Sequence, residues 1–96
     1  MINPKLMNDA NDRLMAAILA LQTKEESYCF FEDLCTVAEL QALAQRLEVA
    51  DMLRAGCTYE KITTRTGAST ATISRVKRAL EYGADGYKVV LERLGK

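Results

Sequence analysis

The stretch from Thr58 to Leu80 constrains the fold most strongly, because two helix-start signals and one helix-stop signal occur close together in it. Thr58 and Ser69 are residue types that cap helix N-termini, since their hydroxyl oxygens accept hydrogen bonds from free backbone N–H groups. Gly67 lies between them and can adopt the positive φ that ends a helix. The pattern predicts two short helices joined by a tight turn.

The second of these helices is predicted to have one buried and one exposed face. Apolar residues at i, i+3 and i+7 share one stripe, made of Ile73, Val76 and Leu80. The residues predicted to face outward are small, hydroxyl-bearing or basic: Thr70, Ala71, Ser74, Arg75 and Arg78. A helix in the DNA major groove needs small polar residues near the base edges and guanidinium groups that reach phosphates or guanine. The segment at about residues 58–80 is therefore predicted to be a DNA-binding helix-turn-helix.

The spacing supports this interpretation. If Tyr59 is the first position of the usual twenty-residue helix-turn-helix pattern, the apolar and glycine positions are filled by Ile62, Gly67, Ile73 and Val76. Two positions depart from the pattern: Thr63 occupies the place of a small residue, and Thr66 that of an apolar one. The alternative is an ordinary pair of solvated helices whose basic residues only confer solubility.

Charge is segregated along the chain, although the formal net charge is zero. Residues 58–80 contain five basic residues and one acidic residue, a net charge of +4. Residues 1–57 contain five basic and nine acidic residues, a net charge of −4, and the last sixteen are balanced. A positive segment on a negative scaffold would orient the molecule on a polyanion such as DNA.

Several other functional classes are disfavoured. The three cysteines lack CxxC spacing and the chain has no histidine, so we expect reduced thiols, no zinc site and no cofactor. The N-terminus has no signal-peptide pattern, and the longest apolar run, Leu14–Leu21, is too short to span a bilayer. Nothing resembles a nucleophile elbow or a convergent catalytic set, so an enzyme is disfavoured. We expect a cytoplasmic protein without a membrane segment.

Capping signals predict four further helices. Asn3-Pro4 would start a first helix running to about Leu21, and capping boxes start others at Thr23 and Thr36. The helix from Thr36 would run to Ala55 and end at Gly56; after a turn in EYGADG, Asp85 would cap a last helix. The result is an all-α chain of six helices, a single domain over residues 1–96. The helix from Thr36 is apolar around most of its circumference, so other helices or a second subunit should cover it.

The segments ELQALAQRLEVADMLRAG and TGASTATISRVKRAL resemble the long central helix and the reading head of the tryptophan repressor family. More closely, the chain from about Thr23 resembles the YerC/YecD branch of TrpR-like proteins. The resemblance implies a six-helix, intertwined homodimer that binds double-stranded operator DNA with its reading heads about one helical turn apart. Residues assigned to base edges are Thr70, Ala71 and Ser74, and those near the DNA backbone are Ser69, Thr72 and Lys77. The basic residues Lys61, Arg75 and Arg78 complete the predicted DNA-binding set.

The resemblance also bears on ligand control. The two arginines that hold the corepressor's carboxylate would be Arg46, with a one-residue uncertainty in register, and Arg75. However, Val76 stands where the repressor has a glycine that leaves room for the indole, and Ala79 replaces a ligand-binding serine. A branched side chain would fill that space, so tryptophan is not expected to be the effector. Both arginines could instead be ordinary surface residues.

These features predict a sequence-specific transcriptional regulator, expected to be a repressor. The alternative is a helix-turn-helix module that docks on a protein of the transcription machinery. Salt dependence separates the two, because phosphate contacts release counterions whereas a mainly apolar protein interface does not.

Overall fold

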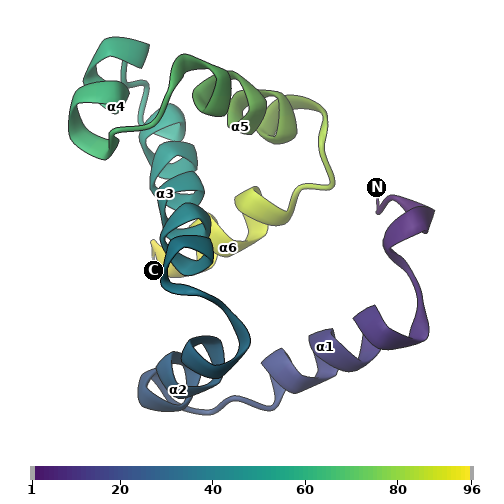
Figure 1. Cartoon of the computed structure of the whole chain (residues 1–96). Coiled ribbons are helices and arrows are strands. Elements are labelled where there is room, and N and C mark those ends of the chain that lie inside the picture. Colours follow the sequence, from purple (N-terminus) through teal and green to yellow (C-terminus); the bar gives the residue numbers. More distant parts are fainter. Residues whose placement is uncertain (1, 96) are drawn as a thin grey trace. The chain divides into compact units, whose positions relative to one another are not determined.

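The computed structural model describes residues 2–95, in which all regular secondary structure is helical (Figure 1). A 3₁₀ turn, η1 (Pro4–Leu6), precedes six α-helices: α1 (Asp9–Leu19), α2 (Lys24–Leu34), α3 (Val37–Arg54), α4 (Tyr59–Thr66), α5 (Thr70–Tyr82) and α6 (Gly86–Leu94). The prediction of an all-α fold is confirmed. No helix in the described part of the chain is long and apolar enough to cross a membrane. The chain forms two compact units, Ile2–Leu40 and the residues from Gln41 onward.

The predicted first helix from Pro4 to Leu21 is wrong. Asn3 accepts a hydrogen bond from the Lys5 N–H at 3.0 Å, but the helix it starts is the single turn η1, after which Met7 is extended. A second cap, Asn8, accepts from the Asn11 N–H at 2.8 Å and starts α1. The Asn11 side-chain amide also donates to the Leu6 carbonyl at 2.7 Å. The α-helix starts at Asn8 and not at Asn3 because two acidic residues follow Asn8 in the first turn, where the helix dipole favours negative charge.

The two predicted capping boxes start α2 and α3. Thr36 and Glu39 bond reciprocally: the Thr36 N–H donates to Glu39 Oε1 at 2.8 Å, and the Glu39 N–H donates to Thr36 Oγ1 at 3.1 Å. Hydrogen bonding to Thr36 holds the pKa of the Glu39 carboxyl below its ordinary value. The backbone N–H of Thr36 has the larger effect and its side chain the smaller one. Thr23 accepts from the Glu26 N–H at 3.0 Å, while the Glu26 carboxylate accepts from the N–H of Gln22, one residue before the cap.

The end of α3 is a Schellman turn at the predicted glycine. Gly56 has a φ of +83°, and its N–H donates to the Leu53 carbonyl at 3.1 Å. The next N–H, of Cys57, donates to the Met52 carbonyl at 3.0 Å. These bonds satisfy carbonyls that would otherwise lack partners and direct the chain into α4.

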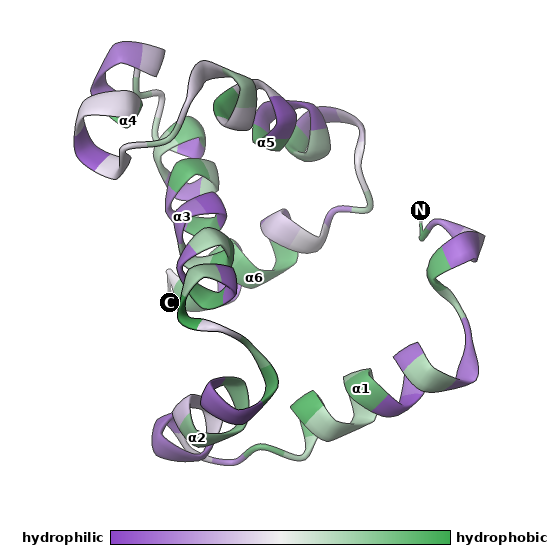
Figure 2. Cartoon of the chain, in the orientation of Figure 1, coloured by the Kyte–Doolittle hydropathy of each residue, from purple (hydrophilic) through white to green (hydrophobic). Residues whose placement is uncertain are grey.

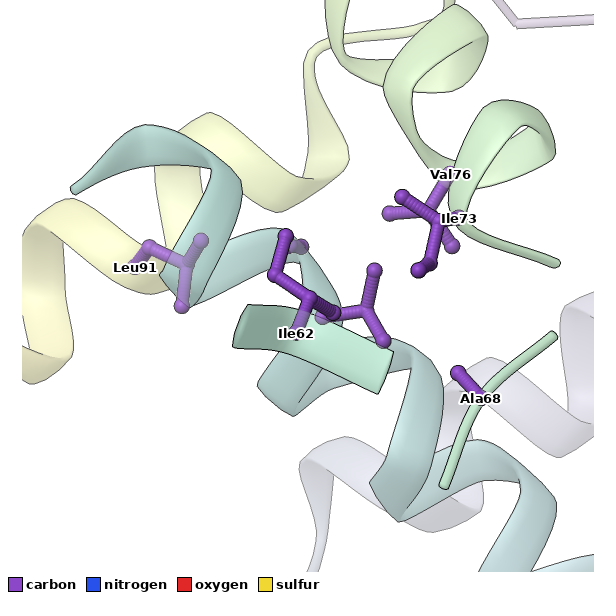
Figure 3. Close-up of a cluster of buried hydrophobic side chains, with 7 residues drawn as sticks. Ile62, Ala68, Ile73, Val76 and Leu91 are labelled. Atoms are coloured by element: carbon purple, nitrogen blue, oxygen red, sulfur yellow. The ribbon is translucent and has the colours of Figure 1, made fainter. Parts of the chain in front are cut away.

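The buried core lies in the unit that begins at Gln41 (Figure 3). Its members come from α3 to α6: Val49, Ala50, Ile62, Ala68, Ile73, Val76 and Leu91. Ile62 and Ile73 are fully buried and Val76 is 2% exposed, as the apolar spacing predicted, whereas Leu80 is only partly buried. Each fully buried side chain of this size contributes about 1.5–3 kcal/mol relative to an exposed one. The core therefore fixes how α4 and α5 are turned about their axes.

The start of α6 differs from the prediction. Asp85 occupies the N-cap position, but its backbone is left-handed, with a φ of +65°, and its side chain makes no capping hydrogen bond. A side chain caps effectively when its backbone is extended, as it is at Thr58 and Ser69. The Asp85 carboxylate lies 3.5 Å from the Lys88 ammonium instead.

Many large apolar side chains remain exposed on a single copy of the chain. Neither α1 nor α2 contains a buried residue. Exposed fractions reach 84% at Leu19 on α1, 67% at Tyr28 on α2 and 74% at Val37 at the start of α3. Figure 2 shows apolar residues along much of α1 and α3. This exposure is unusual for a stable monomer of this size.

Two glycines test whether the turn in the helix-turn-helix depends on backbone conformation. Gly67 has a φ of +74°, whereas Gly86 does not occupy the left-handed region, and an added Cβ would meet nothing within 4 Å at either position. Gly67→Ala should therefore lower the free energy of unfolding by about 1 kcal/mol, through backbone strain alone. Gly86→Ala should be neutral or stabilising by a few tenths of a kcal/mol. Urea denaturation measures both, and equal destabilisation by the two substitutions would contradict the expectation.

Candidate nucleic-acid interface

The segment Thr58–Leu80 forms the predicted helix-turn-helix. Thr58 Oγ1 accepts from the Lys61 N–H at 3.2 Å and starts α4. Gly67 is left-handed, and its N–H closes α4 on the Thr63 carbonyl at 2.9 Å. Ser69 Oγ accepts from the Thr72 N–H at 3.1 Å and starts α5. The two helices are packed against each other, so the caps and the turn act together to define one rigid pair.

The outer side of α5 is turned away from the core and is here called the reading face. It consists of Thr70, Ala71, Ser74, Arg75 and Arg78, all of which are exposed as predicted. Ile73 and Val76 are buried on the opposite side of the same helix, which Figure 3 shows pointing into the core. The position of the reading face is therefore a consequence of the apolar packing beneath it.

The two arginines of the reading face form no ion pair within residues 2–95. They line a shallow depression together with Ser74, Lys77, Glu81 and Tyr82. Arginine presents five N–H donors in a planar fork, which suits phosphate oxygens and the O6 and N7 atoms of guanine. An exposed pair of guanidinium groups beside small residues is suited to an external polyanion.

Lys77 lies on the flank of α5 beside α4. Its ammonium is 6.0 Å from the centroid of the Tyr59 ring and 4.0 Å from Glu81 Oε1. Both side chains of the ion pair are about half exposed, so it contributes little to stability and can yield to a phosphate. Among the other residues predicted to touch DNA, Lys61 and Ser69 are exposed and Thr72 is partly buried.

Tyr82 is absent from the predicted site residues. The predicted helix-turn-helix ends at about residue 80, whereas α5 continues to Tyr82, which is 81% exposed. Its position four residues after Arg78 places it at the far end of the reading face. The signal that could have located it is this i+4 spacing. The Gly83 N–H closes the last turn of the helix by donating to the Ala79 carbonyl at 2.9 Å.

The residues considered for ligand binding lie in different surroundings. Arg46 is partly buried on α3, whereas Arg75 is exposed on α5. Val76 is packed in the core with Ile62 and Ile73. Ala79 lines a separate apolar pocket of about 470 Å³, together with Leu47, Ala84, Gly86, Tyr87 and Val90.

Metal-binding clusters of three or more histidine, cysteine or acidic residues do not occur within residues 2–95. The three cysteines are free thiols: Cys29 is exposed, and Cys35 and Cys57 are partly buried.

The chain belongs to the Trp repressor protein family, whose model matches residues 9–95. This family, together with the helix-turn-helix architecture, indicates a DNA-binding regulator. That family is one of regulators and not of enzymes. The resemblance seen in the sequence is thereby confirmed, and it begins earlier than Thr23.

Individual relatives agree with this assignment. The chain is 61% identical over 90 residues to the uncharacterized protein YerC of Bacillus subtilis (strain 168), covering 94% of this chain and 86% of YerC. It also matches the crystal structure of a TrpR-like protein from Eubacterium eligens, with a TM-score of 0.93, 57% identity and coverage of 97% and 96%. A presumed Trp repressor from Staphylococcus aureus matches with a TM-score of 0.93, 54% identity and coverage of 99% and 95%.

Proposed function

We propose that this chain is a cytoplasmic, sequence-specific transcriptional repressor that binds operator DNA as a homodimer and inserts α5 into the major groove. The observation that carries the proposal is the reading face. It combines small side chains with arginines that form no ion pair among residues 2–95, and it lies directly opposite a buried stripe. Thr70, Ala71 and Ser74 are proposed to contact base edges, while Arg75 and Arg78 reach phosphates or guanine. Lys61, Ser69, Thr72 and Lys77 are proposed to hold the DNA backbone.

Electrostatics support this assignment. Residues 58–80 carry a net charge of +4 within a chain of zero net charge. The N-terminus of α5 adds free backbone N–H groups and the positive end of the helix dipole, and both attract phosphate. Because the first turn of α5 carries no acidic residue, nothing there opposes this attraction.

A homodimer is proposed because one copy leaves too much apolar surface in water. The unit Ile2–Leu40 has no buried side chain in the described residues and would not be stable alone. Leu43 on α3 is also 43% exposed. Covering these residues with a second copy would complete a single folded domain in each chain, and the burial would be worth about 25 cal/mol per Å² of apolar area.

Tryptophan is proposed not to be the effector. Val76 fills the position where the resemblance would require space for an indole, and it is 2% exposed among Ile62 and Ile73. Opening that space would remove packing from the core that positions the reading face. We therefore propose operator binding without tryptophan.

The dimer is tested by sedimentation at micromolar concentration. The wild-type chain should sediment as a dimer, and Leu43→Glu should abolish folding as well as association, since an unpaired charge in the covered surface costs several kcal/mol. Gln41→Glu introduces the same charge at an exposed polar position of α3 and should leave the dimer intact. A folded wild-type monomer would contradict the proposal.

Tryptophan binding is tested by calorimetry. We expect no saturable heat with the wild-type chain and equal DNA affinity with and without tryptophan. Val76→Gly should lower the free energy of unfolding by about 3 kcal/mol, through a core cavity and the helix propensity of glycine, without creating a tight site. A micromolar binding isotherm with the wild-type chain would overturn this proposal.

Salt titrations on an operator duplex and a scrambled duplex test the DNA interface. Lys77→Ala should weaken both complexes about equally and reduce the slope of log K against log salt by about one for each phosphate interaction that is removed. Ala71→Leu should reduce operator affinity by about 1–3 kcal/mol per half-site and leave scrambled DNA nearly unaffected.

The control is Lys88→Ala, which removes an exposed lysine of α6 outside the proposed interface and should change the affinity for neither duplex. If Ala71→Leu affects both duplexes equally, or neither, α5 does not enter the groove by its first turn. The alternative, docking on a protein of the transcription machinery, would then be preferred.

A further inference from the structure

Thr66 occupies the position of the helix-turn-helix pattern where an apolar residue is usual, and the structure shows what its hydroxyl does there. Thr66 Oγ1 donates to the Ile62 carbonyl at 2.7 Å and accepts from the Ala68 N–H at 3.1 Å. The first bond closes the last turn of α4, and the second reaches across Gly67 into the connection to α5. One hydroxyl therefore holds both sides of the turn.

Gln45 connects this turn to α3. Its side-chain amide Nε2 donates to the Thr66 carbonyl at 3.1 Å, and the contact is partly buried. Carbonyls in the last turn of a helix lack intrahelical partners, so the bond satisfies a group that would otherwise depend on water. Gln45 lies 21 residues before Thr66 in the chain, on a helix that contributes Val49 and Ala50 to the core.

This bond differs in kind from the other links between α3 and the helix-turn-helix. It is the one long-range hydrogen bond made by a side chain within residues 2–95, since the others join residues at most five positions apart. The remaining packing between these parts is apolar, and apolar burial has little directional preference. Among the described residues, the Gln45–Thr66 bond is therefore the directional side-chain contact that specifies one orientation of the turn against α3.

We propose that Gln45 and Thr66 are positioning residues that fix the reading head on α3 and thereby set DNA specificity. The inference rests on the proposed function, because it concerns how the same reading face is presented. Base contacts depend on the placement of individual side chains against base edges, whereas phosphate attraction is independent of sequence and tolerates displacement. Removal of the link should therefore affect operator binding far more than nonspecific binding.

The test compares four variants on operator and scrambled duplexes. Thr66→Val keeps the shape but removes the hydroxyl, and Thr66→Ser retains the hydroxyl. Gln45→Met keeps the length of the side chain without its donor, and Thr64→Val is the matched control at an exposed position of α4. We expect Thr66→Val and Gln45→Met to bind the operator about five- to tenfold more weakly, with scrambled-DNA affinity unchanged within about twofold. Thr66→Ser and Thr64→Val should resemble the wild type.

A parallel decrease on both duplexes would make the two residues merely structural and would overturn the inference. Unchanged affinity for both duplexes would also overturn it. Gln45→Met is the decisive variant if Thr66→Val does not fold, because it leaves the hydrogen bonds of the turn itself in place. Amide hydrogen exchange at Ala68 in the free protein separates this inference from the proposed function. Exchange there should accelerate in Thr66→Val, which removes the acceptor of the Ala68 N–H, but not in Thr66→Ser or Gln45→Met, even if the chain binds no DNA. Unchanged exchange in Thr66→Val would contradict the role of the hydroxyl in the turn.

Discussion

The packing of Ile62, Ile73 and Val76 against α3 is the constraint on which the rest of the structure depends. These side chains are almost completely buried, and they come from both helices of the helix-turn-helix. Since α5 has one apolar stripe, burying that stripe leaves a single choice for the side that faces solvent. The exposure of Arg75 and Arg78 follows from this packing and needs no separate explanation.

Polar interactions determine where the helices of the reading head start and add to the orientation that the apolar core gives them. The N-caps at Thr58 and Ser69 define where α4 and α5 start, and Gly67 allows the chain to reverse between them. The Gln45–Thr66 hydrogen bond adds orientation, which apolar contacts alone supply poorly. Charge segregation then gives this head an attraction for a polyanion that the acidic remainder of the chain does not share. Exposed apolar residues outside the head, among them Leu19, are the basis of the proposed dimer, because a single copy leaves them in water. In such a dimer the two half-sites would add to the same binding free energy.

The sequence predicted those parts of the fold that depend on local chemistry. Three kinds of feature depend only on neighbouring residues and are found as expected: the caps at Thr23, Thr36 and Ser69, the positive φ of Gly56 and Gly67, and the apolar stripe of α5.

Features that depend on a choice between two nearby caps, or on contacts between residues far apart in the chain, could not be predicted in this way. Both Asn3 and Asn8 can cap a helix, and α1 starts at Asn8 because of the acidic residues that follow it. Asp85 failed as a cap because its backbone is left-handed, which its side chain alone does not reveal. The partner of Thr66 lies 21 residues away on another helix, and no local pattern points to it. The assignment of individual DNA contacts stays a prediction.

Selection of bound fragments from a pool of random DNA duplexes by the wild-type protein tests the central claim most directly. Two copies of α5 held by one dimer should enrich an inverted repeat whose half-site centres lie about 10–10.5 base pairs, or a multiple of this, apart. Binding to the enriched duplex should weaken steeply with added salt while preference over scrambled DNA persists. Recovery of an unselected pool after repeated rounds, with no enriched sequence, would contradict sequence-specific binding by α5.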